Sequence, residues 1–517
     1  MPLKYLNKII PLILLSACAV QSAGASDDID DRDTRLNPNF EDNTRSDAKE
    51  SLKYSFINYA ANRIEMNGHS WNKLKSKLES TGEGHIVNIV HIGDSHIQAE
   101  GNTSHVRKNL QASYGDAGRG LIIPFRLAGT NQPLDYRISS SASMTSAKLL
   151  KTPWPTKMGF TGISLQAPRS SFDVTITNEK PFSLLNVLGS GKIHIRAIIS
   201  NGEGIGFRQY STYSGQVAEL DKSVSSATIS IDAPDANIFG FDLRNEKSGI
   251  IYSAIGNNGA AFSSYSQIPH FGHELNALKP DLVIISLGTN EAFGKISDYT
   301  FYNCIKTLVD DIRQHNPGVE ILLTTPSECQ RSTYKTVRTG KKRRRRTRRI
   351  RQFEVNHNVA RLADVIRRFG RENHIPVYDF YAVAGGNGAS EKWVSNRLLS
   401  GDRIHRTWAG YKLEGELLSR ALAKALDAPK SSASVQMIPI GVHSNETDNA
   451  EALVNNSFAR STDNRQNVSS SDSKKNSKVK NNKSNVKNKK SSKAKSKKSA
   501  KRKKKKTKKT KSRRRRR

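Results

Sequence analysis

The feature that most constrains the fold is a set of short, continuously apolar segments that alternate with helical ones. Residues 86–91 (IVNIVH) and 281–286 (DLVIIS) are apolar over most of their length, as strands buried on both faces are. Strands that alternate with helices predict a parallel sheet and an α/β fold. The later elements of this pattern are a helix at 296–315, a strand at 320–325, a helix at 352–373, a last strand at 375–379 and a helix at 413–426.

The middle of the chain, residues 126–250, has a different pattern. Short β-rich runs are separated by Gly, Pro, Asn and Ser, which is typical of an antiparallel sandwich or barrel. Because this segment interrupts the α/β pattern, we expect an inserted β-sandwich-like domain that the chain enters and leaves at neighbouring points. The runs are 171–177 (SFDVTIT), 192–199 (KIHIRAII), 227–231 (ATISI) and 237–243 (NIFGFDL).

Residues 51–80, ahead of the first strand, carry helical periodicity. Apolar residues recur there at spacings of three or four, at Tyr54, Ile57, Ala60 and Ile64, and this spacing predicts a helix. The preceding residues 19–50 are polar and acid-rich, so we expect a flexible tether.

The first 18 residues have the pattern of an export signal. Two lysines precede an apolar stretch at 9–15, which is far shorter than the roughly 20 residues that a membrane-spanning helix needs. Residues 15–18 (LSAC) resemble the lipobox of bacterial lipoproteins, which implies cleavage before Cys18 and lipidation of its thiol. We expect an exported, membrane-anchored lipoprotein that faces the periplasm or the cell exterior; the alternative is an ordinary secretory peptide.

Positive charge is concentrated in two segments of this 517-residue chain, whose formal net charge is +36. Residues 473–517 hold 26 Lys and Arg and no Asp or Glu, and residues 341–351 hold nine more Lys and Arg. The rest of the chain is therefore nearly neutral, and the basicity says little about a catalytic substrate.

The C-terminal segment, residues 429–517, loses its apolar content toward its end. It cannot offset its ordering entropy, so we expect a disordered basic tail. This tail should bind polyanions with a steep salt dependence. Because 473–517 lacks aromatic residues for base stacking, no specific nucleic acid is expected as a partner. For 341–351, we favour a solvated, mobile loop; the alternative is capture of an anionic polymer.

Cys304 and Cys329 are the cysteines that remain after Cys18. Two cysteines are too few for a fold built on disulfides. An oxidising compartment permits a bridge between them, and two free, buried thiols are equally open.

Four short motifs supply the groups that an ester hydrolase needs, namely a nucleophile, a base, an orienting group and oxyanion donors. Ser95 in GDSH follows the first strand, where a sharp glycine turn exposes a nucleophile. His405 and Asp402 in DRIH are three residues apart, so one loop can present both. Gly259 in GNNG and Asn290 in GTNE can add a backbone N–H and a side-chain amide to the N–H of Ser95.

The order of these motifs resembles the SGNH (GDSL-like) hydrolase superfamily, whose name stands for Ser95, Gly259, Asn290 and His405 in this sequence. The resemblance implies a three-layer α/β/α fold with a parallel sheet. It also implies an acyl-enzyme on the serine and neither a metal nor another cofactor. The hydrolase domain would then consist of two parts, 51–125 and 251–428.

Three departures point to one branch of this superfamily. His96 takes the place of the usual leucine in the first motif, a β domain follows that motif, and residues 114–120 read YGDAGRG. These features are similar to peptidoglycan O-acetylesterases and their O-acetyltransferase relatives, in which the insert is a carbohydrate-binding-like module.

We therefore interpret the chain as a serine esterase that removes O-acetyl groups from a glycan, with peptidoglycan as the best single guess. Ser95 is the expected nucleophile, His405 the base and Asp402 the orienting group. Two alternatives stay open: a glycan O-acetyltransferase with the same triad, and a non-catalytic cell-surface protein that binds glycan.

Further residues in these motifs receive secondary roles. Candidate substrate contacts are His96, Asn258 and Glu291, with a packed position as the alternative for His96. We expect Asp94 to shape the turn and His91 to belong to the core.

Overall fold

The computed structural model describes residues 54–340 and 346–427. The predicted export signal with Cys18, the tether at 19–50 and the tail at 429–517 lie outside the described residues, as do residues 341–345. No helix in the described part is long and apolar enough to cross a membrane.

A six-stranded sheet contains the segments that the sequence predicts as buried strands. Its order is β1-β18-β15-β14-β2-β13. The pairs among β18, β15, β14, β2 and β13 are parallel, whereas β1 pairs antiparallel with β18 at one edge. The predicted parallel sheet is therefore confirmed for five strands, and β1 adds an antiparallel edge that was not predicted. The strands are β1 (Ile64–Glu65), β2 (Ile86–Gly93), β13 (Gly249–Gly256), β14 (Leu282–Ser286), β15 (Glu320–Thr324) and β18 (Val377–Tyr378).

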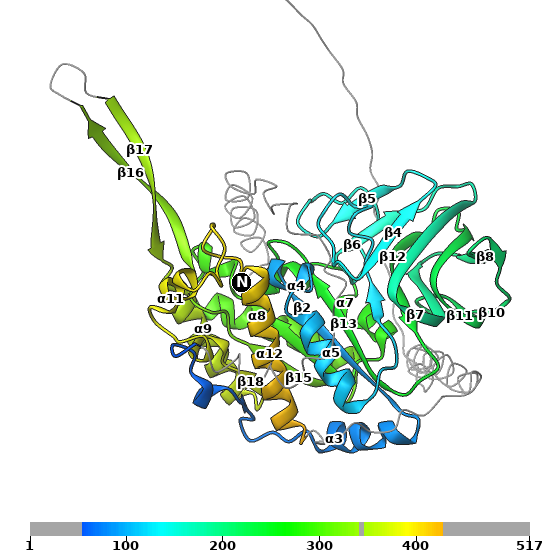
Figure 1. Cartoon of the computed structure of the whole chain (residues 1–517), viewed down its shortest axis with the longest axis horizontal. Helices are drawn as coiled ribbons and strands as arrows, with labels where there is room; N and C mark the ends of the chain where they lie inside the picture. The colour runs from blue at the N-terminus through cyan, green and yellow to red at the C-terminus, as the bar shows by residue number, and fades with distance from the viewer. Residues whose placement is uncertain (1–53, 341–345, 428–517) are drawn as a thin grey trace, which may run out of the picture. The chain divides into compact units, whose positions relative to one another are not determined.

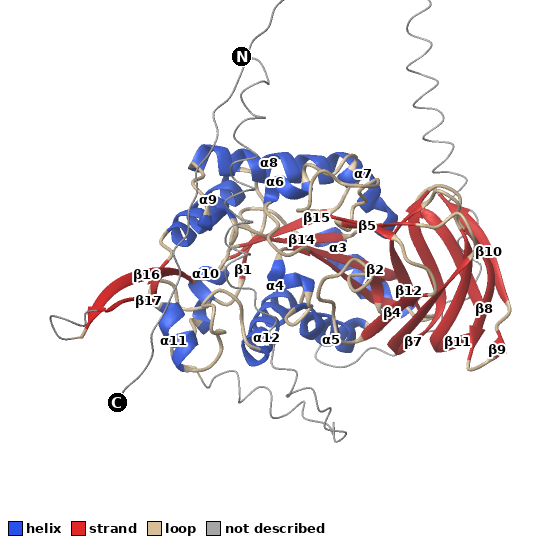
Figure 2. Ribbon diagram, turned by 90° about the horizontal axis from the view of Figure 1, so that it is seen from above, coloured by secondary structure: helices blue, strands red, loops and turns tan. Residues whose placement is uncertain are grey.

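Helices cover both faces of this sheet (Figure 2). Helices α6 (Phe262–Tyr265), α7 (Phe271–Leu275), α8 (Asp298–His315) and α9 (Asn358–Glu372) place apolar side chains in one core. A second core contains side chains of α3 (Asn72–Glu79), α5 (Thr103–Tyr114), α10 (Phe380–Val383), α11 (Ala389–Ser395) and α12 (Trp408–Ala425). The remaining short elements are α4 (Ser95–Gln98), η3 (Tyr59–Ala61), η4 (Ser80–Glu83), η5 (Asn276–Leu278) and η6 (Glu291–Phe293).

The continuous apolar strands serve these two cores by alternation. In β2, Val90 and Ile92 join the core of α8 and α9, while Val87 and Ile89 join the core of α5 and α12. Successive side chains of a strand point to opposite faces, so a strand covered on both sides must be apolar throughout. The three-layer arrangement follows from this pattern.

The middle of the chain forms a second, ten-stranded sheet whose pairs are all antiparallel. All four predicted β-rich runs lie largely within its strands, as expected. These strands are β3 (Gly120–Ile122), β4 (Tyr136–Ser140), β5 (Thr145–Lys148), β6 (Ile163–Gln166), β7 (Phe172–Ser190), β8 (His194–Ser200), β9 (Glu203–Gly204), β10 (Phe207–Thr212), β11 (Gly215–Asp232) and β12 (Asn237–Arg244).

The chain leaves the first sheet and returns to it at adjacent points. The N–H of Ile250 donates to the carbonyl of Gly115 at 2.9 Å. A Cβ on Gly249 would lie 2.2 Å from the backbone of Gly115, and both glycines have positive φ angles, so only residues without a side chain fit this crossing. The second sheet starts at β3, earlier than the predicted boundary at 126, and β13 belongs to the first sheet from Gly249 onward.

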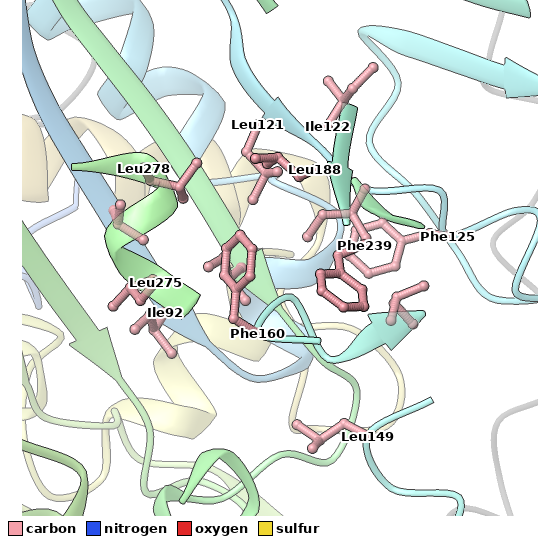
Figure 3. Packing of buried hydrophobic residues seen from close by; sticks show 14 of the residues in the cluster. Ile92, Leu121, Ile122, Phe125, Leu149, Phe160, Leu188, Phe239, Leu275 and Leu278 are labelled. Atoms are coloured by element: carbon pink, nitrogen blue, oxygen red, sulfur yellow. The ribbon is translucent and has the colours of Figure 1, made fainter. Parts of the chain in front are cut away.

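One apolar core joins the two sheets. Figure 3 shows Ile92 of β2 and Leu275 of α7 in the same cluster as Leu188 of β7 and Phe239 of β12. Because the two sheets pack on common side chains, the prediction of a separate inserted domain is not confirmed.

The helix predicted for 51–80 is wrong for most of its length. Only Asn72–Glu79 forms an α-helix there, and Ile64 lies in β1. Ile57 and Ile64 are buried in the core of α5 and α12, so their spacing reflects packing of an irregular segment. Asn67 and Gly68 both have positive φ angles, which a right-handed helix excludes.

Two long strands, β16 (Gln330–Thr339) and β17 (Arg346–Val355), pair antiparallel as a hairpin. The favoured prediction of a loop at 341–351 is therefore wrong from Arg346 onward, and the helix predicted from 352 starts at Asn358. Thr, Ile, Phe and Val recur among the arginines of β17, and such residues favour extended backbone. The remaining predicted elements match, although α12 starts at Trp408 rather than 413.

Cys304 and Cys329 are both free thiols. Cys329 is buried and Cys304 is half-buried. Burial raises the pKa of the Cys329 thiol to about 12, so neither a bridge nor a reactive thiolate arises here.

Candidate active site

Ser95 lies at the carboxyl end of β2, as its sequence position predicts. Asp94 caps the short helix α4, and its side chain accepts a hydrogen bond from the N–H of His96 at 2.9 Å. A Cβ on Gly93 would lie 2.2 Å from the side chain of Ile97. Glycine before the serine therefore permits the tight turn from strand to helix that presents Ser95 at the sheet edge.

Ser95, His405 and Asp402 form a continuous hydrogen-bonded chain. The distance from Ser95 Oγ to His405 Nε2 is 2.7 Å, and that from His405 Nδ1 to Asp402 Oδ2 is 2.6 Å. An ionised carboxylate only accepts hydrogen bonds, so Nδ1 must carry the proton. Nε2 is then free to accept the hydroxyl proton of Ser95, which is the arrangement of a general base beside a nucleophile.

Asp402 is held ionised by its surroundings. Burial would raise its pKa, but hydrogen bonds from His405, Ser400 and the N–H of Ile404 outweigh burial and hold the pKa well below its usual range. Burial also lowers the pKa of His405, yet the hydrogen bond and charge of Asp402 outweigh it, so this pKa is raised. The pair therefore stabilises the imidazolium that forms when the histidine takes a proton.

Arg406 fixes the loop that carries this pair. It is 8% exposed, its Nε lies 3.3 Å from Glu414, and its guanidinium carbon lies 4.9 Å from the Trp393 ring centroid. It also hydrogen-bonds to the carbonyl of Ile404 at 3.2 Å and to Ser327. These contacts limit the motion of residues 402–405. The sequence motif ends at His405, and nothing in the sequence singles out Arg406.

Asn290 lies beside the Ser95 turn. Its Nδ2 donates to Asp94 at 3.2 Å and to the carbonyl of Ala260 at 2.9 Å. The N–H groups of Ser95 and Gly259 have no acceptor among the described residues. Burial raises the pKa of Asp94 to about 6. Asp94 thus shapes the turn, as expected, and also orients the Asn290 amide.

His96 packs behind the catalytic histidine. The two rings lie 5.2 Å apart between centroids, and His96 Nδ1 lies 3.1 Å from Tyr411 Oη. Burial lowers the pKa of His96 well below its ordinary value, so the ring is neutral. His96 and Tyr411 therefore support His405 from one side, and a substrate contact at His96 stays a prediction.

Asn258 belongs to a polar network that the sequence does not reveal. Its N–H donates to Gln98 Oε1 at 2.7 Å, and its amide donates to Asn131 Oδ1 at 2.8 Å. The Gln98 amide donates to Thr130 Oγ1 and to Asn131. The network joins α4 to the loop that precedes β4, so a loop of the second sheet's segment borders the site.

Glu291 is buried beside the start of α6. It is 7% exposed, and its carboxylate accepts a hydrogen bond from the N–H of Phe262 at 2.8 Å. Burial raises its pKa to about 7. This side chain therefore satisfies the start of α6 inside the protein, and a substrate contact at Glu291 stays a prediction.

His91 lies in the core, as expected. Its ring nitrogens lie 2.7 Å from Tyr252 Oη and 2.6 Å from Ser286 Oγ. Burial lowers its pKa to about 3. Within residues 54–340 and 346–427, no cluster of three or more His, Cys, Asp or Glu side chains is arranged to hold a metal ion.

Comparisons with known proteins agree with this geometry. Residues 232–413 match the GDSL-like lipase/acylhydrolase family. This range includes Gly259, Asn290, Asp402 and His405 but not Ser95, which precedes the second sheet. No curated protein matches the chain.

One solved structure shares the fold, and two others match shorter parts of the chain. A peptidoglycan O-acetylesterase has a TM-score of 0.56 and 22% identity over 70% of this chain and 99% of its own. A lipase/acylhydrolase from Enterococcus faecalis has a TM-score of 0.25 and 21% identity over 36% of this chain and 82% of its own. An acetylxylan esterase from Geobacillus stearothermophilus has a TM-score of 0.25 and 17% identity over 36% and 76%.

The first of these similarities spans both sheets, because it covers 70% of this chain, more than the segment of either sheet alone. The family match covers the part of the first sheet that follows the second one. The chain is therefore an ester hydrolase with a GDSL-like lipase/acylhydrolase domain, and its fold resembles that of a peptidoglycan O-acetylesterase.

Proposed function

We propose that this protein removes O-acetyl groups from a glycan through an acyl-enzyme on Ser95. The observation that carries the proposal is the hydrogen-bonded chain from Ser95 through His405 to Asp402. His405 takes the hydroxyl proton while Ser95 Oγ attacks the acetyl carbonyl carbon. The tetrahedral intermediate then collapses, and His405 returns the proton to the departing sugar oxygen. Asp402 keeps the imidazole in the required tautomer throughout.

A water molecule completes the reaction. His405 takes a proton from this water as it attacks the acetyl-serine, and acetate leaves when Ser95 recovers its proton. The developing oxyanion needs preorganised donors. We assign this role to the N–H groups of Ser95 and Gly259 and to the amide of Asn290, whose hydrogen bond to Asp94 is the longer of its two.

Peptidoglycan is the substrate that we propose. Support comes from the similarity to a protein described as a peptidoglycan O-acetylesterase, which extends over 70% of this chain and so includes the second sheet. The loop with Thr130 and Asn131 lies against α4, so the segment of the second sheet can contact the glycan beside the acetyl group. Asn258 and His96 are the further contacts that we propose.

Acetate release tests this proposal. We would compare O-acetylated peptidoglycan with acetylated xylan, using wild type and Ser95→Ala side by side. Ser95-dependent release of acetate from peptidoglycan is the expected result. Release from xylan alone would contradict peptidoglycan as the substrate. Transfer of acetate to an added sugar acceptor, without free acetate, would indicate the transferase alternative. Glycan retention without either reaction would indicate a binding protein.

We also propose that the protein is an exported lipoprotein. Support comes from residues 15–18 (LSAC) and the short apolar stretch before them. In cells fed a labelled fatty acid, the wild-type protein should become labelled, whereas the Cys18→Ala protein should not. Equal labelling of both proteins would contradict lipidation at this cysteine. The basic tail at 473–517 is proposed to bind polyanions, which a salt titration of membrane binding would test.

A further inference from the structure

The hairpin of β16 and β17 projects from the α/β part of the protein (Figures 1 and 2). Its described side chains are mostly exposed, and Tyr334 is 52% exposed and Ile350 42% exposed. Strands that expose both faces and both edges gain little from burial, so stability does not explain why such long strands are kept. The hairpin therefore requires another explanation.

The strand register sorts the side chains onto two faces, because directly opposed residues of an antiparallel pair share a face. One face carries the pairs Tyr334–Arg351, Thr336–Arg349, Arg338–Thr347 and Ser332–Phe353. Three arginines and two aromatic rings thus share this face, and no acidic residue lies on it. We call Arg338, Arg349, Arg351, Tyr334 and Phe353 the arginine face.

The opposite face is different in charge. Arg331 is paired with Glu354, and Glu354 accepts a hydrogen bond from Thr333 at 3.2 Å. Lys335 and Arg348 are the exposed cations of this face in the described part of the hairpin. The hairpin therefore offers two surfaces with similar exposure but unequal aromatic content, and only one of them is free of acidic groups.

Aromatic rings and guanidinium groups stack along the arginine face. The guanidinium carbon of Arg349 lies 4.7 Å from the Tyr334 ring centroid, and that of Arg351 lies 4.7 Å from the Phe353 ring centroid. Stacking holds a guanidinium flat while its N–H edge stays available for an anion. The face is thus prepared for planar anionic groups such as carboxylates.

The arginine face starts at the loop that carries Asp402 and His405. In this loop, the guanidinium carbon of Arg403 lies 5.0 Å from the Phe353 ring centroid. The carbonyl of Arg403 accepts a hydrogen bond from the N–H of Gln330 at 3.0 Å. Nη1 of Arg403 is buried and has no hydrogen-bond acceptor among the described residues. The Arg403 guanidinium therefore adds a positive charge where the hairpin meets the loop of Asp402 and His405.

We propose that the arginine face binds an acidic glycan, a sugar polymer with carboxylate groups, and leads it from the hairpin to Ser95. Successive same-face positions of a strand are about 7 Å apart, so the arginines can each meet a different anionic group along a chain. Charge complementarity and the aromatic rings beside the cations fit a polymer of sugar rings with pendant carboxylates. Binding itself needs no ester, but the direction toward Ser95 rests on the proposed function.

The test uses the full-length Ser95→Ala protein and a short oligogalacturonate, which has carboxylates but no ester. Hydrogen–deuterium exchange locates the binding on the chain, so the basic tail does not confuse the result. Two matched double variants each remove two exposed cations: Arg349→Gln with Arg351→Gln on the arginine face, and Lys335→Gln with Arg348→Gln on the opposite face. A neutral galacto-oligosaccharide is the control ligand.

We expect the acidic ligand to protect the hairpin, with half-protection at about tenfold higher concentration in the arginine-face variant and little change in the opposite-face variant. Equal weakening in both variants would overturn the proposal, because it would indicate net charge alone. Absence of hairpin protection would also overturn it, as would stronger protection by a single-stranded oligonucleotide.

Activity separates this proposal from the proposed function. In the catalytically active chain, the arginine-face variant should keep wild-type hydrolysis of p-nitrophenyl acetate. Its KM for an acetylated acidic glycan should rise about tenfold without a change in kcat. If the wild type does not hydrolyse p-nitrophenyl acetate, the proposed function is contradicted. The hydrogen–deuterium exchange experiment would still test binding of the acidic ligand to the arginine face.

Discussion

Two groups of charged side chains lie near the Ser95 turn in the fold, yet they are built differently. In the first, His405 and Asp402 have side chains 39% and 35% exposed. In the second, Arg119 and Glu100 have side chains 2% and 4% exposed. The first group is open to a substrate, whereas the second is sealed from water.

The sealed group consists of four charges in a closed network. Arg107 and Arg119 each bond to both Glu100 and Asp135, at distances of 2.6–3.0 Å. Burial would raise the pKa of Asp135, but the charges of Arg119 and Arg107 outweigh burial and lower this pKa to about 2. Glu100 follows α4, and Asp135 precedes β4, so the network fastens the Ser95 turn to the segment of the second sheet.

The comparison shows that similar chemistry serves two ends. The accessible pair, Asp402 and His405, leaves room for proton transfer to a substrate. The sealed network holds the Ser95 turn in place beside that pair. We therefore expect variants of the open group to lose turnover while stability is kept, and variants of the sealed group to lose stability first.

Ser95→Ala should have the largest effect. Loss of the nucleophile is expected to lower kcat about 10⁶-fold without a change in melting temperature, because a half-exposed hydroxyl contributes little to packing. Ser113→Ala on α5 removes another half-buried serine hydroxyl and should leave kcat unchanged. Steady-state kinetics beside thermal melts check both. Substantial turnover in Ser95→Ala would remove the serine from its role.

Asp402→Asn should lower kcat about 10⁴-fold, because the amide no longer fixes the histidine tautomer. The pH profile gives a second readout. His405 must be neutral to act as a base and its pKa is raised, so kcat/KM should increase with pH through a midpoint above the ordinary histidine value. The variant loses the interaction that raises this pKa, and its midpoint should move to lower pH. An unmoved midpoint would contradict the assignment.

Arg119→Met should reduce the free energy of unfolding by about 3–5 kcal/mol, because it leaves buried carboxylates without a partner. At a temperature where the variant is folded, kcat should stay within about threefold of wild type. Arg169→Met removes an exposed pair and should not change the melting temperature. Urea unfolding measures the difference. Equal free energies of unfolding in both variants would mean that the buried network does not stabilise the protein.

The sealed network also predicts an acid limb of stability. The folded-state pKa of Asp135 is depressed to about 2. Its contribution to the free energy of unfolding is therefore fully present above the pKa of the carboxyl group in the unfolded chain, and it is lost as pH falls toward 2. Asp135→Asn should therefore destabilise the protein at pH 6 more than at pH 2. A pH-independent difference would contradict this pKa.

Among the three substitutions at Ser95, Asp402 and Asn290, Asn290→Ala should have the smallest effect on turnover, about 10²–10³-fold in kcat, which is the usual loss for one oxyanion donor. Asn258→Ala removes a neighbouring amide that bonds to Asn131 and should change KM rather than kcat. The same kinetic assay serves both. An unchanged kcat in Asn290→Ala would restrict this residue to orienting Asp94.

The open group could be predicted from the sequence because its members lie in short motifs. Asp402 and His405 share one loop, and Ser95 follows a strand that is apolar throughout, so local rules bring them to one edge of a parallel sheet. The sequence does not reveal how Glu291 is bonded: it belongs to the same motif as Asn290, but its carboxylate accepts a hydrogen bond from the N–H of Phe262.

The sealed group could not be predicted, because its partners come from different elements. Glu100 and Arg119 are 19 residues apart, and only the packing of the second sheet on the first brings Asp135 to them. The hairpin shows a related limit. The arginines of β17 indicate solvent exposure in the sequence. The strand forms because β17 pairs with Gln330–Thr339, and the sequence does not show that pairing.

Covalent labelling tests the central claim most directly. The purified protein would be treated with diisopropyl fluorophosphate, and the modified residue would be located by mass spectrometry of its peptides. We predict one adduct, on Ser95, whose formation parallels the loss of esterase activity and requires His405 in its neutral form. An adduct on another residue, or full activity in protein labelled at Ser95, would contradict the account.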